Sequence, residues 1–281
     1  MFQDIAPDVY DNSYHNIQPA KKDYIVIFKN NNVFLHKEDD LSYALPQKKD
    51  LPDVEYIYLF SVSESRYFLD LNEYTPSLDG FQFEPDRIIR TVKPKRLCFV
   101  LAAARSLYQF YTQHRYCPSC KTELVRDDRE RMLKCPNCQM MIYPTISPAV
   151  IVGIVNKDRI LMSRYQGRAY KHYALIAGFN EIGETIEETV IREVKEEVGL
   201  KVRNITYYKS QPWTFTNSLL MGFFCELDGD DRITLQEDEL SEAGWFTAEE
   251  IPPAEDEISL TNEMNEVFRT GRIRDFLPIK Q

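Results

Sequence analysis

Hydrophobic positions along this chain follow two patterns, and each predicts a different kind of element. From residue 96 to about residue 114 the apolar positions recur at helical spacing, which predicts an amphipathic helix. The first 20 residues show no period, and we expect a mobile arm there. Runs rich in β-branched and aromatic residues predict strands at residues 24–28, 54–60, 66–70, 148–155 and 159–162.

A second helical pattern follows a short apolar segment in the second half of the chain. Residues 173–176 predict a buried strand, and Ala177-Gly178 predicts the turn that leaves it. Gly199 suits the left-handed C-terminal cap of the helix that follows. Three apolar residues share one face of this helix and would pack it on a sheet: Ile191, Val194 and Val198.

The polar side of that helix carries three carboxylates. Glu193, Glu196 and Glu197 have the spacing i, i+3 and i+4, which places them on one face. Close carboxylates repel one another, whereas a hard cation such as Mg²⁺ or Mn²⁺ prefers oxygen ligands and would bind them together. Arg192 neighbours Glu196 on the helical wheel and could hold a carboxylate in its working rotamer. An ordinary solvated acidic helix is the alternative.

Composition and length set bounds on function. A chain of 281 residues suggests two domains, and 43% hydrophobic residues suffice for a sizeable core. The net charge of −10 argues against a large basic surface for nucleic acid, although a single-stranded end could still enter a pocket. No apolar run reaches membrane-spanning length, and no signal-peptide pattern is present. We therefore expect a soluble cytoplasmic protein without a membrane partner.

The cysteines predict a metal site. Four of the six form two pairs, each with two residues between its members: Cys117 with Cys120, and Cys135 with Cys138. Two such pairs can place four thiolates tetrahedrally around a structural Zn²⁺, whereas disulfides are the alternative. Cys98 and Cys225 lie in apolar surroundings and are interpreted as small core residues.

The acidic helix and the loop before it resemble the Nudix box. Gly178, five residues, Glu184, seven residues and then the run from Arg192 to Leu200 match every defining position of that motif. The resemblance implies an α/β/α sandwich around a mixed sheet. It also implies a hydrolase that splits a nucleoside diphosphate linked to a further group, without saying which group.

A second motif narrows the resemblance. Residues 210–218, Ser-Gln-Pro-Trp-Thr-Phe-Thr-Asn-Ser, are similar to the signature of NADH pyrophosphatases, the zinc-ribbon branch of the Nudix superfamily. Those enzymes split NAD(H) into AMP and nicotinamide mononucleotide, and bacterial members remove NAD caps from RNA. The resemblance implies an α/β protein and a homodimer. The implied parts are an N-terminal α/β domain at 1–112, a zinc ribbon at 113–144 and a Nudix domain at 145–281.

The chain departs from the family pattern at a few positions. Thr214 and Thr216 stand where the signature has prolines, so this loop is less rigid, which could widen the substrate range or weaken the preference for nicotinamide. Lys121 and Gln139 follow the second cysteine of each pair, where a glycine is often found.

Pyrophosphate hydrolysis requires neutralisation of charge and an activated water, which clustered Mg²⁺ or Mn²⁺ ions supply. The expected ligands of these ions are Glu193, Glu197, the backbone carbonyl of Ala177 and, by the resemblance, Glu239. Asp238 or Glu242 could replace Glu239. Glu196 is a further ligand or orients the water, and Glu193 or Glu197 is the general base. Arg192 completes the catalytic set.

Substrate recognition is expected to use flat side chains. Stacking a base on an aromatic ring is worth about 1–3 kcal/mol, although each aromatic residue could instead belong to the core. The expected substrate-binding residues are Tyr143, Phe179, Gln211, Pro212, Trp213, Thr214, Phe215, Thr216, Asn217, Ser218 and Thr261. Tyr143 and Thr261 enter this set by resemblance alone.

Three functions fit the sequence. The first is metal-dependent hydrolysis of NAD(H). The second uses the same chemistry on the 5′ end of NAD-capped RNA, or on another derivative such as ADP-ribose or a diadenosine polyphosphate. The third is a ligand sensor without catalytic activity. Such a sensor does not need the carboxylates of the Nudix box, whereas this chain keeps all of them.

Overall fold

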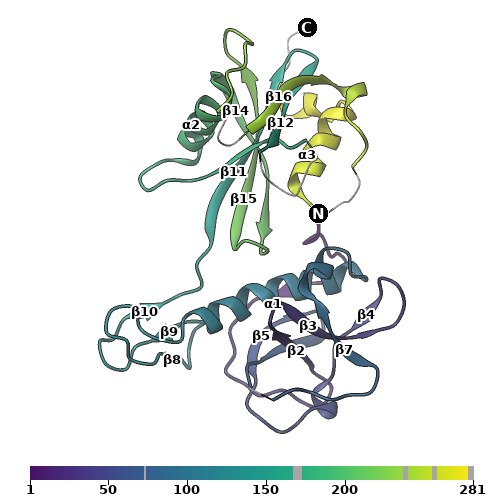
Figure 1. Cartoon of the computed structure of the whole chain (residues 1–281), viewed down its shortest axis with the longest axis vertical. Coiled ribbons are helices and arrows are strands. Elements are labelled where there is room, and N and C mark those ends of the chain that lie inside the picture. The colour runs from purple at the N-terminus through teal and green to yellow at the C-terminus, as the bar shows by residue number, and fades with distance from the viewer. Residues whose placement is uncertain (73, 167–172, 237–239, 255–257, 278–281) are drawn as a thin grey trace. The chain divides into compact units, whose positions relative to one another are not determined.

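The structure is a computed structural model that describes residues 1–72, 74–166, 173–236, 240–254 and 258–277 (Figure 1). The chain separates into two compact units. The C-terminal unit comprises Met1, Ile146–Trp213 and Asn217–Gln281, and the N-terminal unit comprises Phe2–Thr145 with Thr214–Thr216.

A mixed sheet of six strands, counted within the described residues, forms the C-terminal unit. The strand order is β14-β15-β11-β12-β16, and β13 pairs with β11. β11 and β15 run parallel, whereas the other neighbours are antiparallel. The bounds are β11 (Ser147–Asn156), β12 (Arg159–Tyr165), β13 (Ile176–Phe179), β14 (Val202–Trp213), β15 (Ser218–Leu227) and β16 (Leu240–Thr247).

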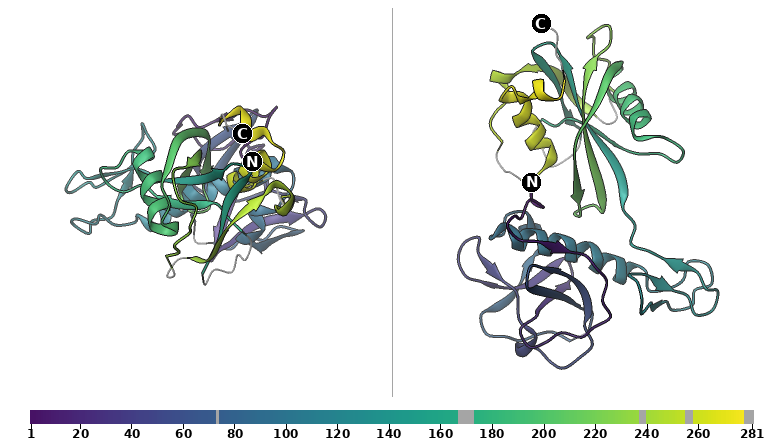
Figure 2. Two further views of the ribbon diagram at one scale, coloured as in Figure 1. Left: turned by 90° about the horizontal axis from the view of Figure 1, so that it is seen from above. Right: turned by 180° about the vertical axis from the view of Figure 1, so that it is seen from behind.

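Helices cover both faces of this sheet (Figures 1 and 2). α2 (Ile186–Val198) packs on one face and α3 (Leu260–Arg269) on the other, with the 3₁₀ turns η3 (Ala248–Glu250) and η4 (Arg272–Asp275) beside α3. Successive residues of β11 point to opposite faces. Its core residues accordingly divide into Val150, Val152 and Ile154 on the α2 side, and Ile151 and Val155 on the α3 side. The expected α/β/α sandwich around a mixed sheet is confirmed.

The N-terminal unit combines a larger sheet, one long helix and a small three-stranded sheet. The larger sheet has the order β1-β5-β6-β2-β3-β4, with β7 on β3, and its β2–β6 pair is parallel. The helix α1 (Lys95–Gln113) leads into the small sheet, β10-β9-β8. In the described part of the chain, no helix is long and apolar enough to cross a bilayer.

The bounds in this unit are β1 (Tyr10–Asp11), β2 (Tyr24–Lys29), β3 (Asn32–Lys37), β4 (Tyr43–Ala44), η1 (Lys48–Asp50), β5 (Ile57–Val62), β6 (Ser65–Asp70), β7 (Phe81–Pro85), η2 (Asp86–Arg90), β8 (Val125–Arg126), β9 (Leu133–Lys134) and β10 (Met141–Ile142). The predicted helix at 96–114 and the strands predicted at 24–28, 66–70, 148–155 and 159–162 are confirmed. The strand expected at 54–60 begins at Ile57, and of the strand expected at 173–176 only Ile176 lies in β13.

The first 20 residues are not the mobile arm that we expected. They supply strand β1, which pairs with β5. Gln18 exchanges two hydrogen bonds of 3.1 Å with the backbone of Tyr56. The hydroxyl of Tyr14 donates to the carbonyl of Asp127 at 2.8 Å. These residues are held by individual polar contacts and by single rings such as those of Phe2 and Tyr10, which both pack on Phe99. They do not form a periodic apolar face, so the sequence shows no pattern.

Two further expectations around α2 are wrong. Ala177 and Gly178 do not form a turn, because β13 begins at Ile176 and includes both residues. Ile191 is 49% exposed, and the buried stripe of α2 uses Val190 with Val194 and Val198. On a helix, residues three and four positions before Val194 both lie near its face, so either Ile191 or Val190 could extend the apolar stripe. The position of the sheet decides which of the two is buried.

Candidate active site

Both ends of α2 are fixed by local hydrogen bonds. At its N-terminus the hydroxyl of Thr185 accepts from the backbone N–H of Glu188 (3.2 Å), and the Glu188 carboxylate accepts from the N–H of Thr185 (2.7 Å). At the other end Gly199 has φ 72°, the expected left-handed cap, and its N–H donates to the Lys195 carbonyl. The helix therefore presents its side chains in a defined register.

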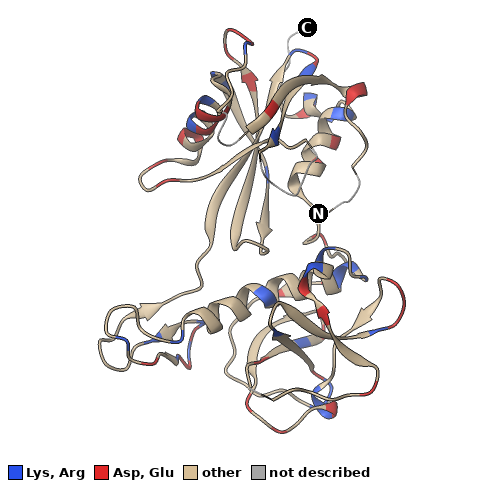
Figure 3. Cartoon of the chain, viewed as in Figure 1, with Lys and Arg blue, Asp and Glu red and all other residues tan. Residues whose placement is uncertain are grey.

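The three carboxylates of α2 differ in their exposure. Glu193 and Glu197 are 8% and 1% exposed, whereas the side chain of Glu196 is 52% exposed. Figure 3 shows acidic and basic segments together along this helix. Burying two carboxylates one helical turn apart is costly unless a cation or a proton compensates their charge. The burial of Glu193 and Glu197 argues against the alternative of an ordinary solvated helix face.

Arg192 binds several oxygen atoms around this helix. Its Nε and Nη2 bind both oxygens of Glu184 at 2.6 and 2.9 Å. Its Nη1 donates to Glu193 at 2.8 Å and to Glu196 at 3.0 Å, and Nη2 also donates to the carbonyl of Phe179. The expected contact with Glu196 is present. Because a guanidinium group presents its donors in a fixed plane, it restricts the rotamers of all three glutamates.

Glu184 is the residue whose role the sequence interpretation missed, since it served only to identify the motif. Besides Arg192, its carboxylate accepts from the Thr189 hydroxyl (2.9 Å) and from the backbone N–H of Glu181 (3.2 Å). The hydrogen bonds from Arg192 lower the pKa of Glu184 from 4.5 to about 2. Glu184 lies before the helix, so helical spacing could not link it to Arg192. Charge complementarity across the loop was the only available signal.

This lowered pKa predicts a pH dependence of stability. The folded pKa lies below the unfolded one, so the ion pair contributes fully above about pH 4.5, and its contribution is lost as the pH falls toward 2. We expect Glu184→Gln to lower the free energy of unfolding at pH 7 and the difference from wild type to shrink below pH 4.5. Urea titrations from pH 7 to pH 3 measure it, with the exposed Glu187→Gln as control. A difference that is constant with pH would contradict the assignment.

Gly178 brings the Glu193 carboxylate against strand β13. A Cβ added to Gly178 would lie only 1.9–2.3 Å from that carboxylate, so a larger residue there would displace the Glu193 carboxylate. Ala177 is adjacent, and its carbonyl lies 3.4 Å from the hydroxyl of Tyr165. The expected ligands Ala177 and Glu193 thus come from neighbouring positions, and Glu197 lies one turn further along α2. Carboxylate and carbonyl oxygens are the donor set that Mg²⁺ or Mn²⁺ prefers.

The ligand expected from outside the helix is not placed. Glu239 and Asp238 both lie outside the described residues. Glu242, the other alternative, accepts from the Tyr173 hydroxyl at 2.7 Å and pairs with Arg164 at 3.1 Å. Its carboxylate is therefore already bound by two partners. Among the described residues, the box glutamates by themselves do not form a compact group of three or more metal-ligating atoms.

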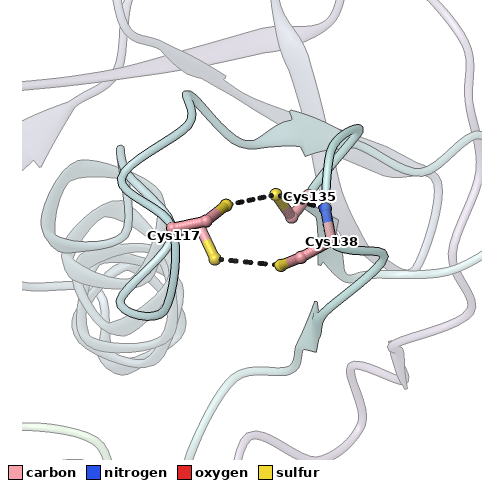
Figure 4. Close-up of side chains that lie close together, drawn as sticks. Cys117, Cys135 and Cys138 are labelled. Atoms are coloured by element: carbon pink, nitrogen blue, oxygen red, sulfur yellow. Dashed lines mark hydrogen bonds between the residues drawn. The ribbon is translucent and has the colours of Figure 1, made fainter.

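The four expected zinc ligands do converge. Their sulfur atoms all lie within 4.8 Å of one another, with Cys117–Cys138 at 3.5 Å and Cys120–Cys135 at 3.4 Å (Figure 4). All six cysteines are described, and none forms a disulfide, so that alternative is wrong. A hydrogen bond with Thr122 lowers the pKa of Cys120 to about 5, whereas hydrogen bonds with the sulfur atoms of Cys117 and Cys135 raise the pKa of Cys138. Cys98 and Cys225 are buried core residues, as expected.

Two non-glycine residues occupy the left-handed turns of these cysteine loops. Lys121 and Gln139 both have φ 63°, and each donates its N–H to the carbonyl of the first cysteine of its pair. A left-handed backbone conformation costs an L residue about 1–2 kcal/mol, which glycine avoids. Part of this gain is offset because glycine gives the unfolded chain more conformational entropy. We expect Lys121→Gly and Gln139→Gly each to stabilise by up to about 1 kcal/mol in urea unfolding. Lys134→Gly, in strand β9, is the destabilising control; no gain in either loop variant would contradict the strain argument.

The expected substrate residues differ in their exposure and in the unit to which they belong. Tyr143 and Phe179 are exposed, as side chains open to a ligand must be. Pro212, Trp213, Thr216, Asn217 and Thr261 are exposed or partly buried, whereas Gln211 and Ser218 are buried. Thr214–Thr216 belong to the N-terminal unit. There the Phe215 ring packs on Phe2 (centroids 5.6 Å apart) and faces the Arg90 guanidinium at 4.9 Å, a packing role.

Comparison with known proteins shows the family of this chain. The NUDIX domain family matches residues 145–267. The chain is 34% identical to the NAD-capped RNA hydrolase NudC of Pseudomonas aeruginosa over 218 residues, which cover 76% of this chain and 78% of that protein. It is 42% identical to the protein of the same name from Chromobacterium violaceum, covering 63% and 66%. A crystal structure of a NUDIX hydrolase from Nitrosomonas europaea matches with TM-score 0.46 and 20% identity, covering 56% of this chain and 92% of that one.

Proposed function

This chain belongs to the Nudix family, in the branch of the NAD-capped RNA hydrolases compared above, and we propose that it hydrolyses the pyrophosphate bond of NAD(H). The expected products are AMP and nicotinamide mononucleotide. The burial of Glu193 and Glu197 on α2, with Arg192 bound to Glu193, carries this proposal. Catalysis, rather than ligand sensing, explains why the chain keeps a costly set of buried carboxylates.

The box residues divide the work of hydrolysis. Glu193, Glu197 and the Ala177 carbonyl, with Glu239, would hold divalent cations. When bound, such ions neutralise the pyrophosphate and lower the pKa of a water. A carboxylate oxygen of Glu197 or Glu193 accepts the proton that the attacking water loses, and Glu196 is a further ligand or orients that water. Arg192 keeps Glu193 and Glu196 in the rotamers that this geometry needs.

The NAD cap of an RNA is the second candidate substrate. The names of the relatives support it, since they are NAD-capped RNA hydrolases. The same bond would be cleaved, giving nicotinamide mononucleotide and an RNA with a 5′ monophosphate. This requires a substrate site that is open at the 3′ side of the adenosine ribose. The net charge of −10 favours recognition of the cap and its first nucleotides over a long electrostatic contact with the RNA body.

The remaining expectations accompany this proposal. We propose a structural Zn²⁺ on the four cysteines, a homodimer, a cytoplasmic location and the division into domains at 1–112, 113–144 and 145–281. Phe179, Trp213 and Tyr143 are proposed to contact the nucleotide, and the threonines at 214 and 216 to widen its choice. Each of these points can be tested separately from the reaction.

A product assay tests the function. NADH, NAD⁺, ADP-ribose, a diadenosine polyphosphate and a short 5′-NAD RNA are supplied separately with Mg²⁺ or Mn²⁺, and products are resolved by chromatography. AMP and nicotinamide mononucleotide from NADH support the proposal, and a higher kcat/KM for the RNA favours the second candidate. Preference for ADP-ribose or a polyphosphate would contradict both. Binding without cleavage of any substrate would point to a sensor.

A further inference from the structure

Gln211 on strand β14 has a side chain fully engaged in the interior of the C-terminal unit. It is 0% exposed, although the resemblance assigns it to the substrate. Its Nε2 donates to the carbonyl of Ile258 at 2.7 Å, and its Oε1 accepts from the N–H of Leu260 at 2.7 Å. The side-chain amide of Gln211 thus binds the backbone carbonyl before Ser259 and the backbone N–H after it. The backbone of a neighbouring β-strand forms the same pair of hydrogen bonds.

The residue between those two groups begins helix α3. Ser259 is the N-cap, and its hydroxyl accepts from the backbone N–H of Asn262 at 3.2 Å. Because Gln211 holds the backbone on both sides of Ser259, the entry of the chain into α3 is fixed to strand β14. Thr261, in the first turn, follows directly.

A second contact fixes the same turn to the sheet. A Cβ on Gly222 of β15 would lie 2.8 Å from the Met264 sulfur and 3.3 Å from Leu260 Cδ2. The helix therefore lies directly against the sheet with no room for another side chain. α3 is held by an apolar contact at β15 and by polar contacts at β14. Tyr208 and Lys209 of β14 bind the Glu263 carboxylate within the helix at 2.7 and 3.0 Å, whereas Gln211 binds the backbone at the helix entry.

We infer that Gln211 is a positioning residue: it fixes Thr261 relative to the end of β14 and affects substrate binding through α3. This inference rests on the proposed function, with Trp213 at the nucleotide, and on Thr261 as the substrate residue that the family resemblance implies. Trp213 ends β14, two residues beyond Gln211. A buried amide that holds the helix entry couples these two parts of the pocket.

A double-mutant cycle tests the inference. Gln211→Met keeps the length of the side chain and removes both hydrogen bonds, and Thr261→Ala removes the positioned side chain. We expect each single variant to raise KM for NADH by about 10-fold and to keep kcat within about twofold of wild type. The double variant should also raise KM by only about 10-fold, because the effects of residues that act as a unit are not additive. If Gln211 touched the substrate independently, the two effects would multiply to about 100-fold.

A matched cycle with Phe179→Ala serves as control. Phe179 lies on β13 and shares no described contact with the helix entry, so its effect on KM should multiply with that of Gln211→Met. A general loss of structure would instead lower kcat and the fraction folded in every background. Multiplicative effects in the Thr261 cycle would overturn the inference.

Two provisions keep the test decisive. If Gln211→Met does not fold, Ser259→Ala removes the N-cap bond without altering β14, and the same non-additivity with Thr261→Ala is expected. Wild-type protein that leaves NADH intact would contradict the proposed function. In that case the dissociation constant of AMP is measured for the same single and double variants. Multiplicative effects on this constant would contradict the inference about Gln211.

Discussion

Glu197→Gln is expected to lower kcat for NADH by about 10²–10⁴-fold, the range typical for loss of a catalytic acid–base group. The amide has the shape of the carboxylate, but it neither accepts the proton nor contributes charge to a cation. Because Glu197 is 1% exposed, removing its charge relieves a desolvation cost, and the melting temperature should stay equal or rise. Steady-state kinetics and calorimetry measure both quantities.

The control for this variant is Glu187→Gln, an exposed position on the same helix, which should retain wild-type kcat. Binding of Mn²⁺, followed by electron paramagnetic resonance, adds a readout apart from turnover and should weaken in Glu197→Gln. A variant whose kcat stays within threefold of wild type would exclude Glu197 from the reaction and leave Glu193 as the general base.

Loss of zinc is expected to have the largest effect on folding. Structural zinc sites contribute about 10–16 kcal/mol of apparent binding free energy in small zinc-binding peptides at neutral pH. The segment at 113–144 contains only strands of two residues, β8, β9 and β10, and apart from cysteines it buries only the apolar side chains of Leu124, Met132 and Leu133. We expect Cys135→Ser, or a strong chelator, to abolish zinc binding and unfold residues 113–144.

Metal analysis and limited proteolysis of this segment provide the measurement. Wild-type protein should contain about one zinc per chain, the number that one four-cysteine site binds. Cys98→Ala, which removes a buried thiol outside the cluster, should retain it. Full zinc content in Cys135→Ser, or a metal-free wild type that resists proteolysis equally, would contradict a structural role.

Features that depend on neighbouring residues were predictable from the sequence. The apolar period and the glycine cap of α2 lie within 15 residues, and these local signals predicted the helix. The cysteine pairs were also predictable, because a tetrahedral site restricts spacing within each pair. The contact of Arg192 with Glu196 follows from helical geometry alone.

Features set by distant residues were not. Glycine is needed both in turns and where another group approaches closely, and Gly178 serves the second purpose because of Glu193, which lies 15 positions further on. The first 20 residues are ordered by partners such as Tyr56 and Asp127, which no local pattern reveals. Gln211 was predicted to bind substrate because it belongs to a motif that resembles the family signature. Its hydrogen-bond partners, Ile258 and Leu260, lie more than 40 positions further along the chain, so no local pattern indicates them.

The parallel pairing of β11 with β15 has a consequence for how the protein folds. Residues paired across these strands are about 70 positions apart, and the segment from Gly178 to Gly199 lies inside the loop that they close. Closing a loop of this length is entropically costly, and parallel pairs form late for that reason. The reactive carboxylates are therefore assembled only when the centre of the sheet has formed. During refolding, activity should return at the rate at which amide protons of β11 and β15 gain protection, and a collapsed intermediate should contain α2 without any turnover.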